Sequence, residues 1–433
     1  MGRSTGRVLP TNEKRSDLTV TAGEVFPDSG MLEMVRDPSD PARPALLHWD
    51  GKHATVAPEI GVGGRHYVPP EIDPSLWRRL RLPSGFAPYG STTELFDRIR
   101  SLITKYSGLS DEYSRLLTYS TFASHFVDCL QTVPCVVLHG CADAEAIALL
   151  RLLGWLCRHP VLLTDAGLSV PEYLRPTRLI CQPHTSLEKL LAPLQLSGFA
   201  ISRHGSLREI SGATAVYVGD GELRSPFVDS CLWIPVAPTR ELVSCYDEQQ
   251  EAAVIQELQN QLFSYRLVHF GKVKASDFDV PEFSGSIRGL ARTLGACIVE
   301  APDLQACLVE QLQAYDEAVR LDRVSEIHSI LVEALLVCCH ERRSAVHVSE
   351  IADLANDILS RQGEILRLSA REVGGKLKTL GFRTTRLDSA GRGLYLLEEN
   401  CKHIHELAKS YGVPSLREGG LHGCPHCQEL LAR

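Results

Sequence analysis

Residues 133–163 have the order of elements found around phosphate-binding loops. An apolar strand at 135–138 runs into a turn of small residues at 139–142. A strongly apolar helix at 146–157 follows, and then a second apolar strand at 161–163. In a working loop of this kind, glycines let backbone N–H groups approach the phosphates, a lysine reaches the terminal phosphates, and a serine or threonine holds Mg²⁺. The chemistry of this segment therefore depends on the side chains in and after the turn.

The side chains needed for nucleotide binding are missing there. In the spacing G-x-x-x-x-G-K-[ST] counted from Gly140, the second glycine falls at Glu145, the lysine at Ala146 and the serine or threonine at Ile147. Glu145 would repel a phosphate, and the other two residues offer neither a hydrogen-bond donor nor a metal ligand. The degenerate nucleotide site, made of His139, Gly140, Glu145, Ala146 and Ile147, thus favours a scaffold without catalysis. Nucleotide binding without hydrolysis and hydrolysis through unusual residues are the alternatives.

A second group of residues suits contact with a phosphate backbone. Between Arg361 and Arg392 eight basic residues stand against three acidic ones, which leaves +5 in a chain whose net charge is −8. Ser369 and Glu372 have capping-box spacing for a helix, on which residues seven apart share a face. We expect DNA contacts from Arg371, Lys376, Lys378, Arg383, Arg386 and Arg392. The alternatives are a protein-binding surface or a merely solvated face.

The C-terminal residues offer possible metal ligands. Cys424 and Cys427 have the C-x-x-C spacing of one half of a tetrahedral zinc site, and His422 stands just before them. This predicts either a zinc site or a flexible tail with free thiols, because no second pair of ligands follows in the sequence. Residues that could approach the pair are Cys401, His403 and His405.

Other kinds of chemistry have little support in the sequence. Arg288 and Arg292 lie four residues apart, where ATPases often place a charge-sensing arginine, but without a nucleotide they are expected to be surface or salt-bridge residues. The chain has no G-x-S-x-G and no H-E-x-x-H sequence, so neither a serine hydrolase nor a zinc protease is indicated. No catalytic residues are assigned, and no cofactor is expected beyond the possible zinc.

The length and composition set limits on the elements that carry these residues. A chain of 433 residues is enough for about three domains. No apolar stretch approaches the ~20 residues of a membrane span, and the polar N-terminus has no signal-peptide core. Most of the 14 cysteines lie in apolar runs, which indicates free thiols. We therefore expect a cytoplasmic protein without a membrane partner.

The expected fold class is α/β with a C-terminal helical domain. Apolar runs at 135–138, 161–163, 178–182, 215–219 and 232–236 predict five strands of a largely parallel buried sheet. Asp50-Gly51 between alternating runs predicts a type I′ hairpin. The predicted divisions are a disordered N-terminus (1–18), a small β element (19–68), a linker and helices (69–132), the degenerate core (133–240), a helical lid (241–322), a winged-helix domain of three helices and a hairpin (323–413), and a tail with CPHC (414–433).

The order of these elements resembles the ATPase-plus-winged-helix portion of phage and plasmid replication proteins of the primase–helicase kind. The most specific part is the C-terminal motif, Val373, Gly374, Leu377, Leu380, Gly381, Arg386 and Arg392-Gly393. Working members carry acidic residues on the metal-supporting strand, where this chain has Gln182, Pro183 and His184.

The resemblance implies a degenerate P-loop core of the RecA or AAA type with a helical lid. We expect a non-catalytic, DNA-binding, replication-associated protein from a mobile element or its descendant, with DNA as partner and protein partners possible. The alternatives are a divergent active NTPase or helicase, and a scaffold that binds only protein.

Overall fold

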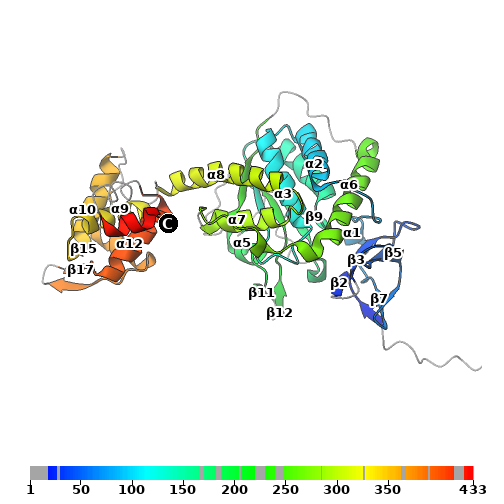
Figure 1. The fold of residues 1–433 in the computed structure, drawn as a ribbon, viewed down its shortest axis with the longest axis horizontal. Helices are drawn as coiled ribbons and strands as arrows, with labels where there is room; N and C mark the ends of the chain where they lie inside the picture. Colours follow the sequence, from blue (N-terminus) through cyan, green and yellow to red (C-terminus); the bar gives the residue numbers. More distant parts are fainter. Residues whose placement is uncertain are drawn as a thin grey trace, which may run out of the picture. The chain divides into compact units, whose positions relative to one another are not determined.

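A computed structural model gives the fold shown in Figure 1. It describes residues 18–26, 30–164, 170–181, 187–203, 206–219, 230–238, 248–283, 285–324, 327–361, 367–388, 391–413 and 424–432. The chain divides into two compact units, Met1–Gln311 and Leu312–Arg433. Of residues 1–18, which are expected to be disordered, 1–17 lie outside the described residues and Leu18 begins a strand. Gln182, Pro183, His184 and His422 also lie outside the described residues.

The first unit begins with two small sheets. One is antiparallel in the order β2-β3-β4-β5, and the other has the order β1-β7-β6. The strands are β1 (Leu18–Val20), β2 (Gly23–Phe26), β3 (Gly30–Arg36), β4 (Pro44–Trp49), β5 (Ala54–Ala57), β6 (Ile60–Val62) and β7 (Arg65–Val68).

The hairpin expected at Asp50-Gly51 joins β4 to β5, but its turn is not type I′. Trp49 pairs with Ala54, so the connection has four residues rather than two. The Asp50 carboxylate accepts hydrogen bonds from the backbone N–H groups of Lys52 (2.8 Å) and His53 (2.6 Å). This side chain closes the turn in the way that Asp commonly does, and it makes the tighter turn unnecessary.

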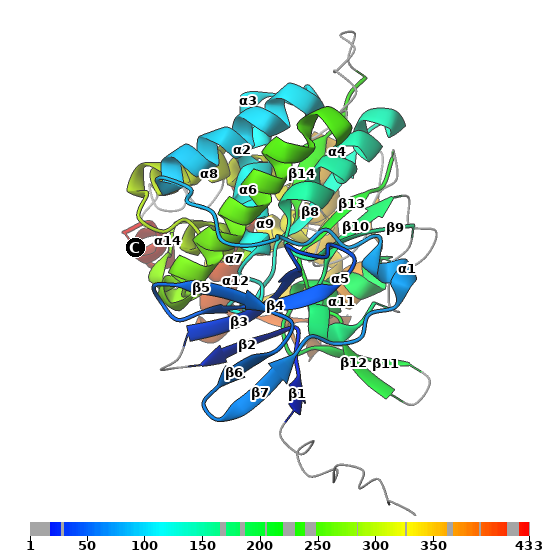
Figure 2. The same cartoon turned by 90° about the vertical axis from the view of Figure 1, so that its right-hand side faces the viewer.

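Strand β3 is covered on both faces. Met31 and Val35 pack with Phe263 and Leu267 of helix α6 (Glu248–His269). On the other face, Leu32 and Met34 belong to a second apolar cluster of the same unit. The N-terminal β region is therefore built into the core of the first unit (Figure 2).

The central sheet has five parallel strands, as the sequence predicts. Their order is β14-β8-β13-β10-β9, with every neighbouring pair parallel. The three inner strands are almost fully buried, which explains their continuous apolar sequences, and the edge strands β14 and β9 are partly buried. The strands are β8 (Cys135–His139), β9 (Pro160–Leu163), β10 (Thr177–Cys181), β13 (Thr214–Tyr217) and β14 (Leu232–Pro235).

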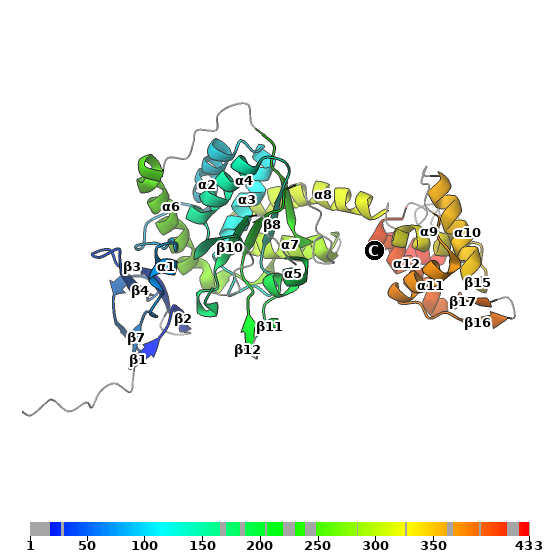
Figure 3. The same ribbon diagram turned by 180° about the vertical axis from the view of Figure 1, so that it is seen from behind.

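Helices cover both faces of this sheet (Figure 3). Gly154 of α4 (Asp143–Leu156) lies against Leu179 of β10, and Leu179 therefore faces α4. The next residue, Ile180, belongs to the apolar cluster that Leu191 of α5 (Leu187–Gln195) completes. Successive residues of a strand point to opposite faces, and α4 and α5 therefore lie on opposite sides.

The first unit has further elements, of which α2 packs against α4 beside an aromatic cluster of Phe96, Phe122 and Tyr265. Ser91 caps α2 by a capping box with Glu94. These elements are α1 (Pro74–Trp77), α2 (Thr92–Ser107), α3 (Asp111–Ser124), the hairpin β11 (Ala200–Arg203) and β12 (Ser206–Glu209), α7 (Gly285–Ala296) and α8 (Pro302–Val324), which continues into the second unit.

In its described residues, the second unit contains the three helices and the hairpin expected from the sequence, together with a further strand and two further helices. Its sheet is antiparallel in the order β15-β17-β16. The elements are α9 (Ile327–His340), β15 (Ala345–His347), α10 (Val348–Arg361), α11 (Ala370–Thr379), β16 (Thr385–Asp388), β17 (Gly391–Tyr395), α12 (Glu398–Tyr411) and α14 (Pro425–Ala432). In the described part of the chain, no helix is long and apolar enough to cross a membrane.

Candidate nucleic-acid interface

Two helix starts and a hairpin form the candidate interface of the second unit. At the start of α10, the backbone N–H of His347 donates to Glu350 Oε2 at 2.8 Å. At the start of α11, Ser369 and Glu372 form the capping box that their spacing predicts. Gly393 lets β17 lie close to β15, because a Cβ there would come within 2.3 Å of the Val346 carbonyl oxygen. This close approach explains the Arg-Gly pair in the motif.

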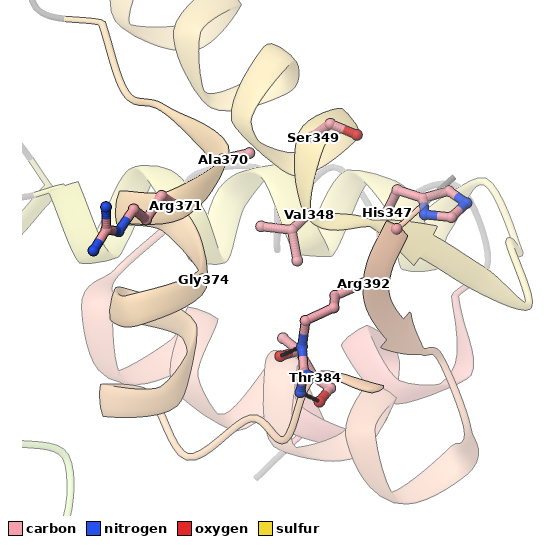
Figure 4. A pocket seen from close by; sticks show the side chains of 9 residues that line it. His347, Val348, Ser349, Ala370, Arg371, Gly374, Thr384 and Arg392 are labelled. Atoms are coloured by element: carbon pink, nitrogen blue, oxygen red, sulfur yellow. Dashed lines mark hydrogen bonds between the residues drawn. The ribbon is translucent and has the colours of Figure 1, made fainter. Parts of the chain in front are cut away.

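A pocket of about 450 Å³ lies between these elements (Figure 4). Val348 and Ser349 of α10, Ala370 and Arg371 of α11, and Arg392 of β17 contribute to its lining. The first N–H groups of a helix have no acceptor within the helix, and the helix dipole makes that end positive. Arg371 and Arg392 make the pocket positively charged, while Glu350 and Glu372 accept backbone hydrogen bonds at the two helix starts.

The basic residues of α11 lie on two faces. Arg371 and Lys378 are two turns apart and share a face with Gly374 and Gly375, whereas Lys376 is turned well away from them. Exposure agrees with this division, since Arg371 and Lys378 are exposed and Lys376 is half-buried. The structure therefore brings two of the three expected α11 residues to one surface. Arg383 is exposed in the segment that follows the helix.

Arg386 and Arg392 stand directly opposite each other on the β16–β17 hairpin. Like charges in this position destabilise an antiparallel pair. Arg392 donates to the backbone carbonyl of Thr384 at 2.5 Å, and Arg386 Nε lies 3.3 Å from the carbonyl oxygen of Asp388. Carbonyl groups orient the two side chains without cancelling their charge, and within the described ranges neither arginine forms an ion pair. The hairpin thus presents two full positive charges at a small cost in stability.

The turn between β8 and α4 is too short for a phosphate-binding loop. Only residues 140–142 separate the strand from the helix. Gly140 has φ 122° and its N–H donates to the Gly219 carbonyl at 3.0 Å. A Cβ at this position would meet the Val236 carbonyl oxygen at 2.4 Å. The glycine is needed for packing, and its amide is already bonded within the protein.

Side chains of the protein itself occupy the start of α4. The Tyr217 hydroxyl lies 2.5 Å from Asp143 Oδ1 and 2.9 Å from the Gly140 carbonyl oxygen. Asp143 and Glu145 stand in the first turn of the helix, where their negative charge interacts favourably with the helix dipole. Ala146 is buried, and the half-buried His139 ring packs against Trp233. Burial lowers the pKa of His139, so a neutral ring is favoured there.

The other expected residues have partners as well. Arg288 and Arg292 both bind Asp279 near the start of α7, Arg292 at 2.8 Å. Cys424 and Cys427 lie beside two histidines, His340 of α9 and His405 of α12. His405 was among the residues considered from the sequence. His340 was not, because nothing in its local sequence links it to a segment 87 residues further on.

Comparisons with known proteins give one set of similar structures. No known protein family and no curated protein matches the chain. An A form apo structure of the NrS-1 C-terminal region is similar at 11% identity and a TM-score of 0.36, and a second A form structure at 10% and 0.37. A third apo structure of that region has 11% identity and a TM-score of 0.33. Each covers 84% of this chain and 96% of that one. TM-scores below 0.5 assign neither a fold family nor a function to this chain.

Proposed function

We propose that the second unit is a winged helix that binds DNA, and that the protein acts without catalysis. The order helix, strand, helix, helix, hairpin, with the first strand paired to the second strand of the hairpin, supports this assignment. In that arrangement α11 enters the major groove, and the β16–β17 hairpin lies along the phosphate backbone or in the minor groove.

The directly opposed arginines of the hairpin, which form no ion pair with any described residue, carry the proposal. A repulsive pair at 386 and 392 has no purpose in stability, but two fixed positive charges suit adjacent phosphates. Arg371 and Lys378 add charge along one face of α11, and Arg371 and Arg392 line the pocket between the helix starts. Together these groups provide sequence-independent affinity.

We further propose that the first unit is a P-loop-type core that does not hydrolyse nucleotide. The all-parallel five-stranded sheet, in which β8 runs through a short turn into α4, supports this proposal. The short turn, the bonded Gly140 amide and the Tyr217–Asp143 contact all oppose a triphosphate. Such a core would serve assembly or partner docking, in keeping with the replication-associated role that the sequence resemblance implies.

The test is fluorescence anisotropy of labelled duplex and single-stranded DNA with the full chain, titrated across salt concentrations. Each phosphate contact contributes about 0.9 to the slope of log affinity against log salt for duplex DNA. We expect Arg386→Ala/Arg392→Ala to weaken binding and to lower that slope by roughly two. Lys376→Ala, on another face of α11, is the matched control and is expected to change both quantities much less.

Parallel titrations with Mg²⁺-ATP separate the competing functions. Binding that ATP leaves unchanged agrees with a non-catalytic core. Binding that ATP alters, together with ATP turnover, would point instead to a divergent NTPase. If neither form of DNA binds, the winged-helix unit is a protein-interaction module and the proposal is wrong.

A further inference from the structure

Four potential metal ligands meet where three helices of the second unit converge. They are His340 at the end of α9, His405 in α12, and Cys424 and Cys427 at the start of α14. One ligand atom from each lies within 4.8 Å of all the others. His405 and Cys427 are fully buried and the other two are half-buried.

The shortest contacts join a histidine to a cysteine. His340 Nε2 lies 3.2 Å from Cys427 Sγ, and His405 Nε2 lies 3.3 Å from Cys424 Sγ. Around a tetrahedral zinc ion, with Zn–S near 2.3 Å and Zn–N near 2.0 Å, ligand atoms stand roughly 3.3–3.8 Å apart. The group therefore needs only small side-chain adjustments to surround an ion.

The hydrogen bonds of His405 fix which nitrogen faces the group. Its Nδ1 lies 2.6 Å from the Cys401 carbonyl oxygen, one helical turn earlier. A carbonyl can only accept, so Nδ1 carries the proton and Nε2 presents its lone pair to Cys424. Metal-binding histidines are commonly held in this way by a backbone carbonyl.

We propose that His340, His405, Cys424 and Cys427 bind one Zn²⁺ ion. Two imidazoles and two thiolates in a compact set favour zinc among the available divalent ions. Four protein ligands complete the tetrahedron, so the ion has no open position for a substrate and its role is structural. Both thiol protons are released when the ion binds.

The ion would fasten α14 to the rest of the second unit. Cys427 belongs to the apolar core formed by α9, α10, α11 and α12, and Cys424 packs at its edge. A helix of eight residues is too short to be stable alone, and two metal bonds at its first turn would hold it in place. This inference is independent of DNA binding.

The test measures metal content in the full chain purified without chelators. Mass spectrometry of the eluted metal is expected to give one zinc ion per chain for the wild type. Cys424→Ser/Cys427→Ser should lose it. The matched control is Cys401→Ser, because that thiol lies beside Cys339 (3.6 Å) but outside the group of four, and serine can still donate to the Leu396 carbonyl.

Cobalt substitution tests the ligand set even where a loss variant folds poorly. Co²⁺ added to metal-free protein should give the visible bands of a tetrahedral site with thiolate charge transfer. His340→Cys should retain the metal and strengthen that charge transfer, since three thiolates and one histidine also form a zinc site. The proposal is overturned if the wild type takes up neither ion, if Cys401→Ser loses zinc as completely as the double variant does, or if the double variant keeps it.

Discussion

Gly375 is a single residue that links stability to the proposed interface. It lies inside α11, where glycine is about 1 kcal/mol less favourable than alanine. A Cβ added there would meet nothing within 4 Å, so packing does not require the glycine. It shares a face with Arg371 and Lys378. A bare backbone between two basic side chains suits close approach to DNA.

We expect Gly375→Ala to raise the free energy of unfolding by about 0.5–1 kcal/mol and to weaken DNA binding. Gly289→Ala in α7 is the control, because that glycine is also helical with open space around it. It should stabilise the protein by a similar amount without affecting DNA. Denaturation and anisotropy measure the two effects. Unchanged DNA affinity in Gly375→Ala would place that face of α11 away from the DNA.

At the scale of elements, a buried charge network attaches β3 to the helices of the first unit. Arg266 of α6 donates to Glu33 (Nε, 2.9 Å) and to Asp128 (Nη1, 2.7 Å). Arg158 donates to Glu33 at 3.0 Å. Burial alone raises the pKa of Glu33, but the two arginines outweigh it and hold that pKa below its usual value. The carboxylate is therefore charged in the folded protein.

Removing the negative charge of Glu33 should destabilise the folded protein. We expect Glu33→Gln to lower the free energy of unfolding by about 3–5 kcal/mol, because two buried guanidinium groups then share the single carboxylate of Asp128. The exposed Lys272–Glu300 pair is the comparison, and Lys272→Gln should cost no more than about 1 kcal/mol. All four tryptophans lie in the first unit, so urea unfolding followed by tryptophan fluorescence reports on this unit. Equal effects of the two changes would contradict a buried network.

For the molecule as a whole, the buried histidines make the first unit sensitive to acid. Burial lowers the pKa of His125 to about 3 and that of His159 to about 4. Each ring is held by a backbone carbonyl, His125 Nε2 by Leu156 and His159 Nδ1 by Leu174. The unfolded chain binds protons at these residues below a pH of about 6.5, whereas the folded chain does not.

The contribution of these histidines to the stability of the first unit is therefore fully present above a pH of about 6.5. It is lost as the pH falls from about 6.5 toward 4. We expect each histidine to account for a loss of roughly 2 kcal/mol between pH 7 and pH 5. His125→Gln keeps a donor near the Nε2 position and cannot titrate, so it should flatten the profile measured by tryptophan fluorescence. His53→Gln, at an exposed position, is the control. An unchanged slope in His125→Gln would show that this ring does not cause the acid sensitivity.

The sequence alone determined the local elements and the bias of charge. Short-range patterns of apolar, capping and turn residues predict three features correctly: the five strands of the parallel sheet, the capping box at Ser369 and the order of helices in the second unit. The sequence also showed that the lysine and the serine or threonine of a phosphate-binding loop are missing after Gly140, because such a motif is a local pattern. The wrong detail was local too: the connection at Asp50-Gly51 has four residues rather than two, and the Asp50 carboxylate closes it.

Only the tertiary structure decided what lies next to what. Strand order depends on how all five strands and their helices pack at once. No local pattern pairs Glu33 with Arg266, which is 233 residues away, or His340 with Cys427. The opposition of Arg386 and Arg392 depends on the register of a hairpin with a bulge. Such contacts are fixed by the packing of the whole chain, since each residue's own neighbours in sequence are compatible with many partners.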